Sequence, residues 1–582
     1  MIQELFQSEL NYLWSKLARA GRGHGEEVEA LLSRDGDPRV ARLVQSAAYA
    51  FARVREKLTD DLPELSHALV ASTLPEALRA TPSATVVQIA DDRRVRMAAT
   101  RFDRQKLSGR ASDGAPSTFE TSWPVDTSPI VLVRGDLRTR EPGLQVLTLR
   151  LEAYPRLTLS AALPGTVRIF VRTKDPNHAI DVVHAICGGG SSLRARILDK
   201  RGHELSACEL PTATLTWTAL APGALPLVRG PADRFSSGTA LRCLFTFPEA
   251  FGFFDLTGLR AVIFPEAAHT LEVSVRLRTI VEERSAEPSF HLHCAPAVNV
   301  FEAPTAPLPL HGLGPCGTLS VTERPACEIL EILDAWVVPD RNPDAIISIR
   351  PWETYRGKPY VDDELYLRPV RRAGLRAEPT QIGVVLLRPN GATALPAGIL
   401  RARVLASDGH RTEALLPGDV AQRSTDSAQM ANLTRVTPAW SPCLDARMPW
   451  RLNAYARMPV SRFCRAASLA SYLDLHDPTG TRRAVPRGAH PAVGGVVAAT
   501  RTPATRVVGS EVRLGDEIDI ILDDNRLGGP GPAWLVAELL ARAASERADF
   551  LRFTRTRLVD AHGSVRSDYG VRSGDRLPPP FG

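Results

Sequence analysis

The sequence contains few cysteines and lysines and no long hydrophobic run, and each shortage argues against a class of protein. Eight cysteines occur among 582 residues and none forms a CxxC pair, a pattern typical of buried or free thiols in a reducing compartment. No run approaches the roughly 18 apolar residues of a transmembrane helix. The opening residues, MIQELFQSEL, lack the basic region and apolar core of a secretory signal. We therefore expect a soluble, cytoplasmic protein.

An excess of charge of one sign is also missing. Basic residues number 71 and acidic residues 65, which leaves a net charge of +6. This excess is too dilute to predict nucleic acid or an anionic membrane as the main partner. Only six of the basic residues are lysine, and the rest are arginine. Arginine makes the bidentate and stacked contacts that interfaces use, but a GC-rich genome produces the same bias and is the explanation we favour.

Sequence signatures of catalysis are missing as well. The chain has no GxxxxGK(S/T) loop, no GxGxxG, no HExxH and no GxSxG, so nucleotide binding, zinc peptidase chemistry and α/β-hydrolase chemistry have no local support. The most metal-like group is His291, His293 and Cys294. On a strand the two histidines share a face and Cys294 lies on the other, whereas zinc needs three protein ligands. We predict no enzyme, no metal site and no cofactor.

One aromatic and acidic segment leaves a different function open. It contains Trp352, Glu353, Tyr355, Tyr360, Asp362, Asp363 and Tyr366. Sugars stack on such rings, and a pair of carboxyl groups hydrolyses glycosidic bonds when the two are held at a fixed separation in a cleft. Adjacency in sequence does not supply that separation. The alternative function is thus a glycan-binding or glycan-hydrolysing multidomain β protein that uses the Trp352–Tyr366 segment.

The spacing of the apolar residues divides the chain into regions. Apolar residues recur at helical spacing at first, and from about residue 84 they alternate with polar residues as in β-strands. We predict an α+β, multidomain fold with a helical N-terminal region (1–103), a linker or long loop (104–129), a first β-rich domain (130–310) and a second β-rich domain with a C-terminal helix (311–582). Because 46 prolines and 41 glycines interrupt the short runs, the β-rich domains should be sandwich-like or irregular. Strands are expected at Gln145–Glu152, Thr166–Thr173, Leu271–Arg278, Ile329–Val337, Thr380–Leu387 and Val512–Asp523, and the C-terminal helix at 533–549.

The N-terminal region contains amphipathic helices that need a partner surface. Phe6, Leu10, Leu13 and Leu17 recur at helical spacing, and Trp14 widens the stripe. Asp37-Pro38 predicts the start of a second helix, because aspartate caps a helix N-terminus and proline favours its first position. Behind it Val40, Val44, Ala47, Phe51, Val54 and Leu58 form a single apolar stripe. The surface that covers these stripes is either another helix or another chain.

Phenylalanine is concentrated at 245–264, where six of the 18 occur. We interpret this cluster as the core of the first β-rich domain, with an exposed aromatic patch as the alternative.

Several of these stretches, in this order, resemble the TssF family, also called VasA or ImpG, the baseplate wedge subunits of type VI secretion systems. Tyr12-Leu13 and Asp37-Pro38 are similar to the family's opening, and PEAFGFFDLTGL, with Phe251, Phe253 and Phe254, is similar to its PE-x-F-x-FF-x-L-x-GL stretch. The most specific piece matches the family line F-x-L-x-C-x-P-x-x-N-x-F, and its matching residues are Phe290, Leu292, Cys294, Pro296, Asn299 and Phe301. Alternation makes the first three of these the inward-facing positions.

The resemblance implies a structural subunit of the baseplate wedge of a type VI secretion system or a related contractile injection machine. The implied partners are a TssG-like wedge protein, a second copy of the chain, a TssK-like adaptor, a TssE-like sheath initiator and the spike, at the cytoplasmic side of the inner membrane. Neither chemistry nor a cofactor, nucleic acid or direct membrane insertion is implied. The stripe of Phe6, Leu10, Leu13, Trp14 and Leu17 is then a candidate docking surface.

The resemblance weakens toward the C-terminus. Residues 534–558 carry arginines where the family usually carries aromatic residues. We expect a second interface at these arginines, with genome bias as the alternative explanation for them: Arg542, Arg547, Arg552, Arg555 and Arg557.

Overall fold

The structure is a computed structural model of the 582-residue chain. It describes residues 2–21, 37–59, 63–89, 99–110, 114–141, 143–188, 193–210, 215–221, 223–227, 236–282, 287–311, 316–324, 326–342, 344–352, 360–372, 380–391, 395–422, 429–442, 444, 447–478, 494–508 and 511–575. The chain divides into two compact units, one of Met1–Pro75 with Leu444–Ala454 and one of Glu76–Cys443 with Tyr455–Gly582.

The first unit is helical. Asp37 accepts a hydrogen bond from the backbone N of Arg39 at 2.8 Å, which confirms the predicted helix start. Within this unit the side-chain Nδ2 of Asn453 donates a hydrogen bond to the backbone O of Ser66 at 3.3 Å. This bond connects the segment Leu444–Ala454 to the N-terminal helices. The helices are α1 (Ile2–Gly21), α3 (Pro38–Thr59), α4 (Pro63–Thr73) and residues of α8 (Arg447–Ala456).

The second unit begins with a closed barrel of strand order β1-β15-β4-β3-β24-β25. The antiparallel pairing of β1 with β15 sets Pro296 opposite Val86. Three distant parts of the chain therefore meet in one barrel, whose strands are β1 (Ala84–Ile89), β3 (Lys106–Arg110), β4 (Pro116–Thr121), β15 (Cys294–Val298), β24 (Ala421–Gln422) and β25 (Met430–Asn432).

These strands correct two of the sequence-based expectations. The predicted helical region 1–103 contains β1 and β2 (Thr100–Phe102), and the predicted linker 104–129 contains β3, β4 and β5 (Val125–Thr127). Leu107 and Phe119 are fully buried on β3 and β4. Buried and exposed residues do alternate in β3. However, the strands in this region are short and Ser, Gly, Pro and Asp surround them, so the composition indicated a loop.

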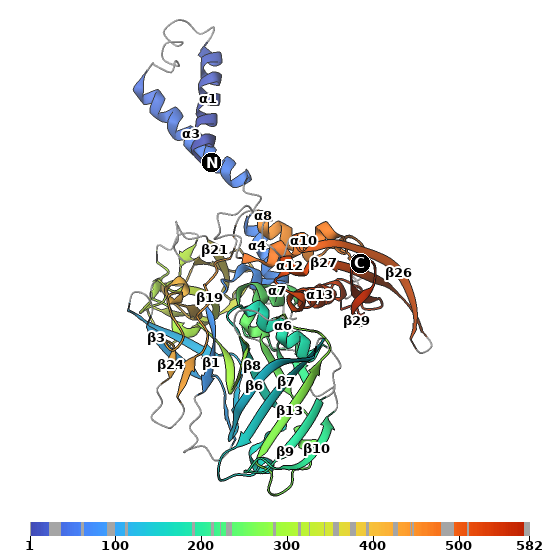
Figure 1. Ribbon diagram of the computed structural model, residues 1–582. Helices are drawn as coiled ribbons and strands as arrows, with labels where there is room; N and C mark the ends of the chain where they lie inside the picture. The colour runs from blue at the N-terminus through green and yellow to red at the C-terminus, as the bar shows by residue number, and fades with distance from the viewer. Residues whose placement is uncertain are drawn as a thin grey trace. The chain divides into compact units, whose positions relative to one another are not determined.

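Two further sheets share one hydrophobic core with the barrel. Figure 1 shows the larger sheet with β6, β7, β13, β9 and β10 side by side. Its strands are β6 (Ile130–Glu141), β7 (Leu144–Ala153), β9 (Leu193–Leu198), β10 (Glu204–Leu210) and β13 (Thr270–Leu277), and the smaller sheet has β8 (Val167–Arg172), β11 (Leu215–Trp217), β12 (Phe253–Leu256) and β14 (Ser289–Leu292). The helices α6 (Pro176–Cys187) and α7 (Ser237–Thr246) contribute to the same core.

An eight-stranded sheet has a hydrophobic core of its own. Its long central strands β19 and β23 pair antiparallel, with Val337 opposite Leu400. The strands are β16 (Phe301–Pro304), β17 (Leu308–Pro309), β18 (Gly317–Thr318), β19 (Glu328–Pro339), β20 (Ile347–Pro351), β21 (Tyr366–Arg372), β22 (Gln381–Leu387) and β23 (Gly398–Ser407).

The C-terminal part of the second unit combines helices with a four-stranded sheet of order β26-β27-β28-β29. The predicted C-terminal helix is present as α13 but does not end the chain, because β28 and β29 follow it. The segment FTRTRLV alternates buried and partly exposed residues, so its β-branched threonines and Val559 favour a strand. The elements are α9 (Val460–Phe463), α10 (Ala466–His476), β26 (Val496–Val508), β27 (Glu511–Leu522), α12 (Asp524–Leu527), α13 (Pro530–Ser545), β28 (Phe553–Val559) and β29 (Val565–Ser573).

The α+β, multidomain class is therefore confirmed. Two details are wrong: the helical region does not extend to residue 103, and the helix near the C-terminus is followed by two strands. All six strands that the sequence predicted are present, with bounds that differ by one or two residues, as β7, β8, β13, β19, β22 and β27.

Candidate interaction surfaces and the motif core

The predicted docking stripe of α1 packs against α3 inside the first unit. Leu10 is buried on Val44 and Ala48 of α3. The remaining stripe residues pack around this cluster and are partly buried: Phe6, Leu13, Trp14 and Leu17. The partner surface for this stripe is thus supplied by the chain itself, at least for Leu10.

The other side of α3 exposes a second apolar stripe. Leu43 and Val54 are 72% and 57% exposed, and Ala50 between them is exposed as well. These three residues recur at seven- and four-residue steps, which places them on one helix face. Phe51 is also exposed. We predicted Phe51 and Val54 on a single stripe with Val44, and this expectation is wrong, because Val44 is buried against α1 whereas Phe51 and Val54 are exposed. Leu43 was not part of the predicted stripe.

The predicted inward positions of the family motif are buried. Phe290, Leu292 and Cys294 belong to the core shared by the barrel and the two sheets. Burial raises the pKa of the Cys294 thiol, so the sulfur stays protonated and packs as an apolar group. Phe290, Leu292 and Cys294 therefore contribute to the packing of the core.

The two motif histidines contact different neighbours. His293 has a backbone φ of +57° and lies between β14 and β15, so the alternation is interrupted there. Its Nε2 accepts a hydrogen bond from the backbone N of Ser128 at 3.3 Å. Burial lowers the pKa of His291, whose Nε2 lies 3.0 Å from the hydroxyl of Ser289. Within the described ranges no three His, Cys, Asp or Glu side chains are grouped closely enough to hold a metal ion.

The motif residue Asn299 is the centre of a buried hydrogen-bond network. Its Nδ2 donates to Asp408 Oδ2 and to Thr118 O, each at 2.9 Å. Its Oδ1 accepts from the backbone N of Asp408 at 2.7 Å and from the hydroxyl of Ser407 at 2.8 Å. Arg324 donates to Asp408 Oδ1 at 3.1 Å. One side chain therefore joins the end of β15, the end of β23 and the barrel strand β4.

The other two motif residues flank this network. The backbone O of Pro296 accepts a hydrogen bond from Ser122 N at 2.9 Å. The guanidinium of Arg324 lies 4.6 Å from the ring centroid of Phe301, a cation–π distance. Asn299 was the motif position whose role only the tertiary structure could reveal, because its partners are distant in sequence.

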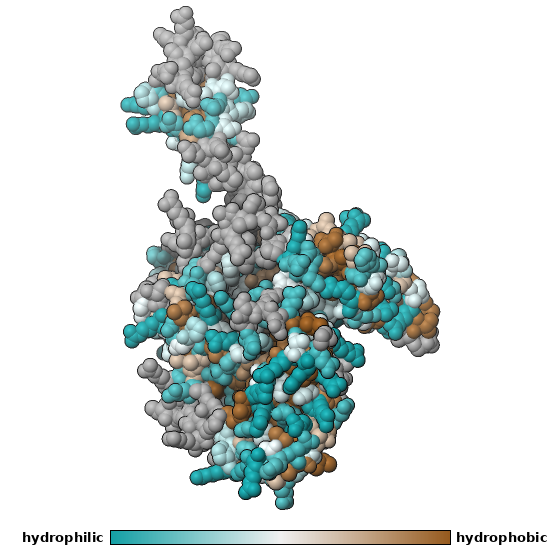
Figure 2. Space-filling model, viewed as in Figure 1, coloured by the Kyte–Doolittle hydropathy of each residue, from teal (hydrophilic) through white to brown (hydrophobic). Residues whose placement is uncertain are grey.

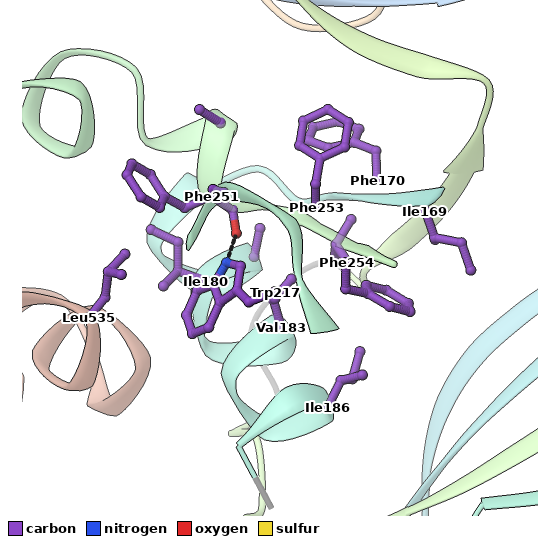
Figure 3. Close-up of a cluster of buried hydrophobic side chains, with 14 of the residues drawn as sticks. Ile169, Phe170, Ile180, Val183, Ile186, Trp217, Phe251, Phe253, Phe254 and Leu535 are labelled. Carbon is purple, nitrogen blue, oxygen red and sulfur yellow. Dashed lines mark hydrogen bonds between the residues drawn. The ribbon is translucent and has the colours of Figure 1, made fainter. Parts of the chain in front are cut away.

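The phenylalanine cluster is core, as predicted. Phe251, Phe253 and Phe254 are fully buried, and Figure 3 shows them beside Ile180, Val183 and Ile186 of α6. The indole Nε1 of Trp217 donates to the backbone O of Phe251 at 2.9 Å. The rings of Phe170 and Phe253 lie 4.7 Å apart. The alternative of an exposed aromatic patch does not hold for these buried rings.

The five C-terminal arginines are not on one helix face. Arg542 lies on α13, where it donates to Glu538 Oε1 at 2.8 Å and to the backbone O of Leu220 at 3.1 Å. Arg547 follows α13 and is 7% exposed. Its guanidinium lies 4.1 Å from the ring centroid of Phe463 and 4.6 Å from that of Tyr472.

The remaining three arginines lie in or next to β28 and pair with acidic residues. Arg552 lies 3.7 Å from a carboxylate oxygen of Asp516. Arg555 donates to Asp568 at 3.0 Å, and Arg557 donates to Asp519 at 2.6 Å. These pairs connect β28 with its neighbours β27 and β29, so the guanidinium groups stabilise the sheet.

The aromatic segment of the glycan hypothesis is only partly described. Trp352 and Tyr360 stack with ring centroids 4.7 Å apart, and Tyr366 meets Tyr360 edge-on at 5.0 Å. Asp362 and Asp363 are exposed. Glu353 and Tyr355 lie outside the described residues. Trp352 and Tyr360 therefore each have one ring face covered by the other ring.

Among the described residues, no helix is both long enough and apolar enough to cross a membrane.

Comparisons with known proteins all identify similarity to TssF proteins of type VI secretion systems. A sequence model of the family described as "Type VI secretion system, TssF" matches residues 1–576. A curated relative, the type VI secretion system component TssF1 of Pseudomonas aeruginosa, is 25% identical over 328 residues, which is 51% of each chain. The chain thus spans about half the length of this relative in the match.

Two solved structures have a similar fold. One is the cryo-electron microscopy structure of the type VI secretion system TssK-TssF-TssG baseplate subcomplex, with a TM-score of 0.73 and 20% identity over 92% of this chain and 100% of the matched chain. The other is the baseplate complex from the type VI secretion system, with a TM-score of 0.59 and 18% identity over 99% of this chain and 100% of the matched chain.

Proposed function

The chain belongs to the type VI secretion system TssF family, and from this premise we propose that it is a structural subunit of a baseplate wedge. The proposed partners are a TssG-like wedge protein and a TssK-like adaptor, because one of the similar structures is a subcomplex of TssK, TssF and TssG. A second copy of the chain, a TssE-like sheath initiator and the spike complete the proposed assembly at the cytoplasmic side of the inner membrane. We expect neither an enzyme activity nor a bound cofactor.

One observation carries the proposal, namely the helical hairpin of α1 and α3 with its second apolar stripe. The hairpin buries Leu10, Val44 and Ala48 on the inside, yet Leu43 and Val54 remain exposed on the outside. Covering these outer apolar residues with a second surface would remove them from water, which favours binding of a partner on this face of α3. A wedge protein that contributes another amphipathic helix would complete a bundle here.

The test is co-expression of the chain with a TssG-like protein from the same organism, followed by size-exclusion chromatography of the complex. The double variant Leu43→Glu, Val54→Glu should reduce the yield of complex at least tenfold, because two charges would be buried in an apolar interface. Gln45→Glu is the matched control, since Gln45 is exposed on another face of α3, and it should assemble normally. A wild-type chain that remains monomeric with this partner would contradict the proposed function.

A further inference from the structure

A cavity of about 190 Å³ lies within the second unit, where the barrel, α7 and the eight-stranded sheet meet. The inner part of its lining is apolar, since Val298 of β15, Leu330 of β19 and Leu405 of β23 are buried there. Arg104 and Gly223 line it as well and are exposed. The cavity therefore connects a buried apolar surface with the solvent.

The size of the cavity limits what it can hold. Sites for small molecules and cofactors measure about 300–1,000 Å³, which exceeds this cavity. An apolar cavity of about 150 Å³ holds one benzene ring, so about 190 Å³ fits one large apolar side chain of a protein. On the face of the second unit that Figure 2 shows, hydrophobic residues form small patches among hydrophilic ones, so a cavity would cover such a side chain better than this face.

Arg104 supplies a positive charge at the opening of the cavity. Its side chain makes no hydrogen bond or ion pair with any residue that the structure describes. Arg79 and Arg242 also line the cavity, but Arg79 pairs with Glu331 at 2.9 Å. Arg242 donates to the backbone O of Glu76 at 3.2 Å. The described lining thus lacks the cluster of free cations by which nucleic acid is bound, whereas Arg104 is available to a single carboxylate.

Two carboxylates also line the cavity and are held by the chain itself. Glu76 accepts hydrogen bonds from the hydroxyls of Ser236 and Thr239 at 3.3 and 3.2 Å. Glu120 is 9% exposed and lies opposite Lys106 of β3. Neither carboxylate pairs with Arg104, so a carboxylate from a partner would find this guanidinium unoccupied.

The backbone at Arg104 has an unusual conformation. Its φ of +42° lies in the left-handed region, which residues other than glycine and asparagine rarely adopt. The next residue fixes this turn, because Gln105 N donates to Thr121 Oγ1 at 2.8 Å and Gln105 O accepts from Thr121 N at 2.9 Å. Strained residues of this kind are concentrated at ligand-binding sites. Here the strained residue is the one that carries the available charge.

We propose that this cavity receives one large apolar side chain of another baseplate protein, and that a carboxylate beside that side chain pairs with Arg104. Burial of the side chain against Val298, Leu330 and Leu405 would supply affinity. The ion pair would select partners that carry a carboxylate at this position. This inference rests on the proposed function, because it places the partner inside the same assembly.

The experiment compares the full-length chain alone with the chain in complex with TssG-like and TssK-like proteins from the same organism. In the wild-type complex, hydrogen–deuterium exchange of the amides at 223–227 should slow at least tenfold. Leu227→Trp should fill the cavity, because Leu227 lines it and is partly exposed, and it should lower the affinity for the partners at least tenfold. Arg104→Asn should lower this affinity at least threefold. The Tm of the isolated Arg104→Asn chain should be unchanged or raised, because asparagine tolerates a positive φ.

The matched controls make the same substitutions outside the cavity. Leu416→Trp and Arg110→Asn are suitable, because both residues are exposed and neither lines the cavity. Arg110 also lies on β3, at the end that is farther along the chain from Arg104. Both control variants should assemble like wild type.

The outcomes distinguish this inference from the proposed function. A complex that forms while exchange at 223–227 stays unchanged, or that tolerates both Leu227→Trp and Arg104→Asn, overturns the cavity site and leaves the wedge role standing. Tolerance of Arg104→Asn alone overturns the carboxylate contact, and tolerance of Leu227→Trp alone overturns the apolar side chain in the cavity. If wild type binds neither partner, both proposals are wrong. The exchange measurement uses the wild-type chain, so it decides the matter even where Leu227→Trp lowers the Tm.

Discussion

The carboxylate Oδ1 of Asp181 accepts a hydrogen bond from the backbone N of Gly531 at 2.8 Å. Asp181 lies on α6, and Gly531 lies in the first turn of α13, where backbone N–H groups have no partner within the helix. The negative charge is also favourable at a helix N-terminus. A buried side chain 350 residues away in sequence thus caps α13 and fixes it against the core.

Gly531→Ala should destabilise the chain through this contact. A Cβ at this position would lie 2.7 Å from the Cα of Asp181 and 2.8 Å from the backbone O of Ile180, and backbone cannot move aside as a side chain does. We expect the free energy of unfolding to fall by about 1–3 kcal/mol, measured by urea denaturation. Gly165→Ala is the control, since the three atoms nearest to its Cβ would all belong to the flexible side chain of Arg260. Equal losses in both variants would contradict close packing of α6 and α13.

Asn299→Ala should destabilise the chain through the network of Asp408. The variant removes two donated and two accepted hydrogen bonds, and it leaves buried groups of Asp408 and Thr118 without this partner. We expect a loss of about 3 kcal/mol in the free energy of unfolding, because each buried polar group left unsatisfied costs about 1–3 kcal/mol. The exposed Asn390 provides the control, and Asn390→Ala should change stability by less than about 0.5 kcal/mol. If Asn299→Ala lowered the free energy of unfolding by less than about 0.5 kcal/mol, the proposed stabilising role of the Asn299 network would be wrong.

His476 should make stability depend on pH below neutrality. Burial, with the charges of Arg242 and Arg547, lowers the pKa of His476 from 6.5 to about 3. Between these values the unfolded chain binds a proton that the folded chain does not. The free energy of unfolding contributed by this group is complete above pH 6.5 and falls as the pH drops, by at most about 1.4 kcal/mol per pH unit.

The measurement is the slope of unfolding free energy against pH, from about pH 7 to about pH 4, in wild type and in His476→Leu. The variant lacks the titrating ring and should therefore have the flatter slope at the acidic end. The difference between the two slopes cancels groups that titrate in both proteins. Parallel slopes would show that His476 is protonated as easily in the folded chain as in the unfolded chain.

Arg547 and Arg555 should respond differently to charge reversal, although the sequence placed them together. Arg547→Glu is expected to lower the free energy of unfolding by about 3–5 kcal/mol, because it puts an unpaired carboxylate among buried groups. Arg555 is partly exposed in its pair with Asp568, so Arg555→Glu should cost less than about 1 kcal/mol. Thermal and urea unfolding of both variants check this. Comparable losses would mean that Arg547 is not buried as described.

Much of the local structure could be predicted from the sequence. The alternation in strands such as β7 and β13 is a local pattern and determined these strands to within one residue. The helical period of Phe6 to Leu17 correctly indicated a helix there, which is α1. The burial of Phe290 and Leu292 followed from the same alternation, whereas Cys294 starts a new strand after the interruption at His293 and is buried with all of β15. Pairing in the barrel could not be predicted, because β1, β15 and β25 are far apart in sequence and their pairing is non-local.

The sequence by itself determined that the chain is α+β, that its phenylalanine cluster is core and which motif residues face inward, because the spacing of apolar side chains carries this information. Only the tertiary structure decided which apolar surfaces remain open. It covers Leu10 with α3 but exposes Leu43 and Val54 on the same hairpin. It also buries Arg547 and leaves Arg506 exposed. The physical reason is that burial depends on what packs against a side chain, and that partner is often hundreds of residues away.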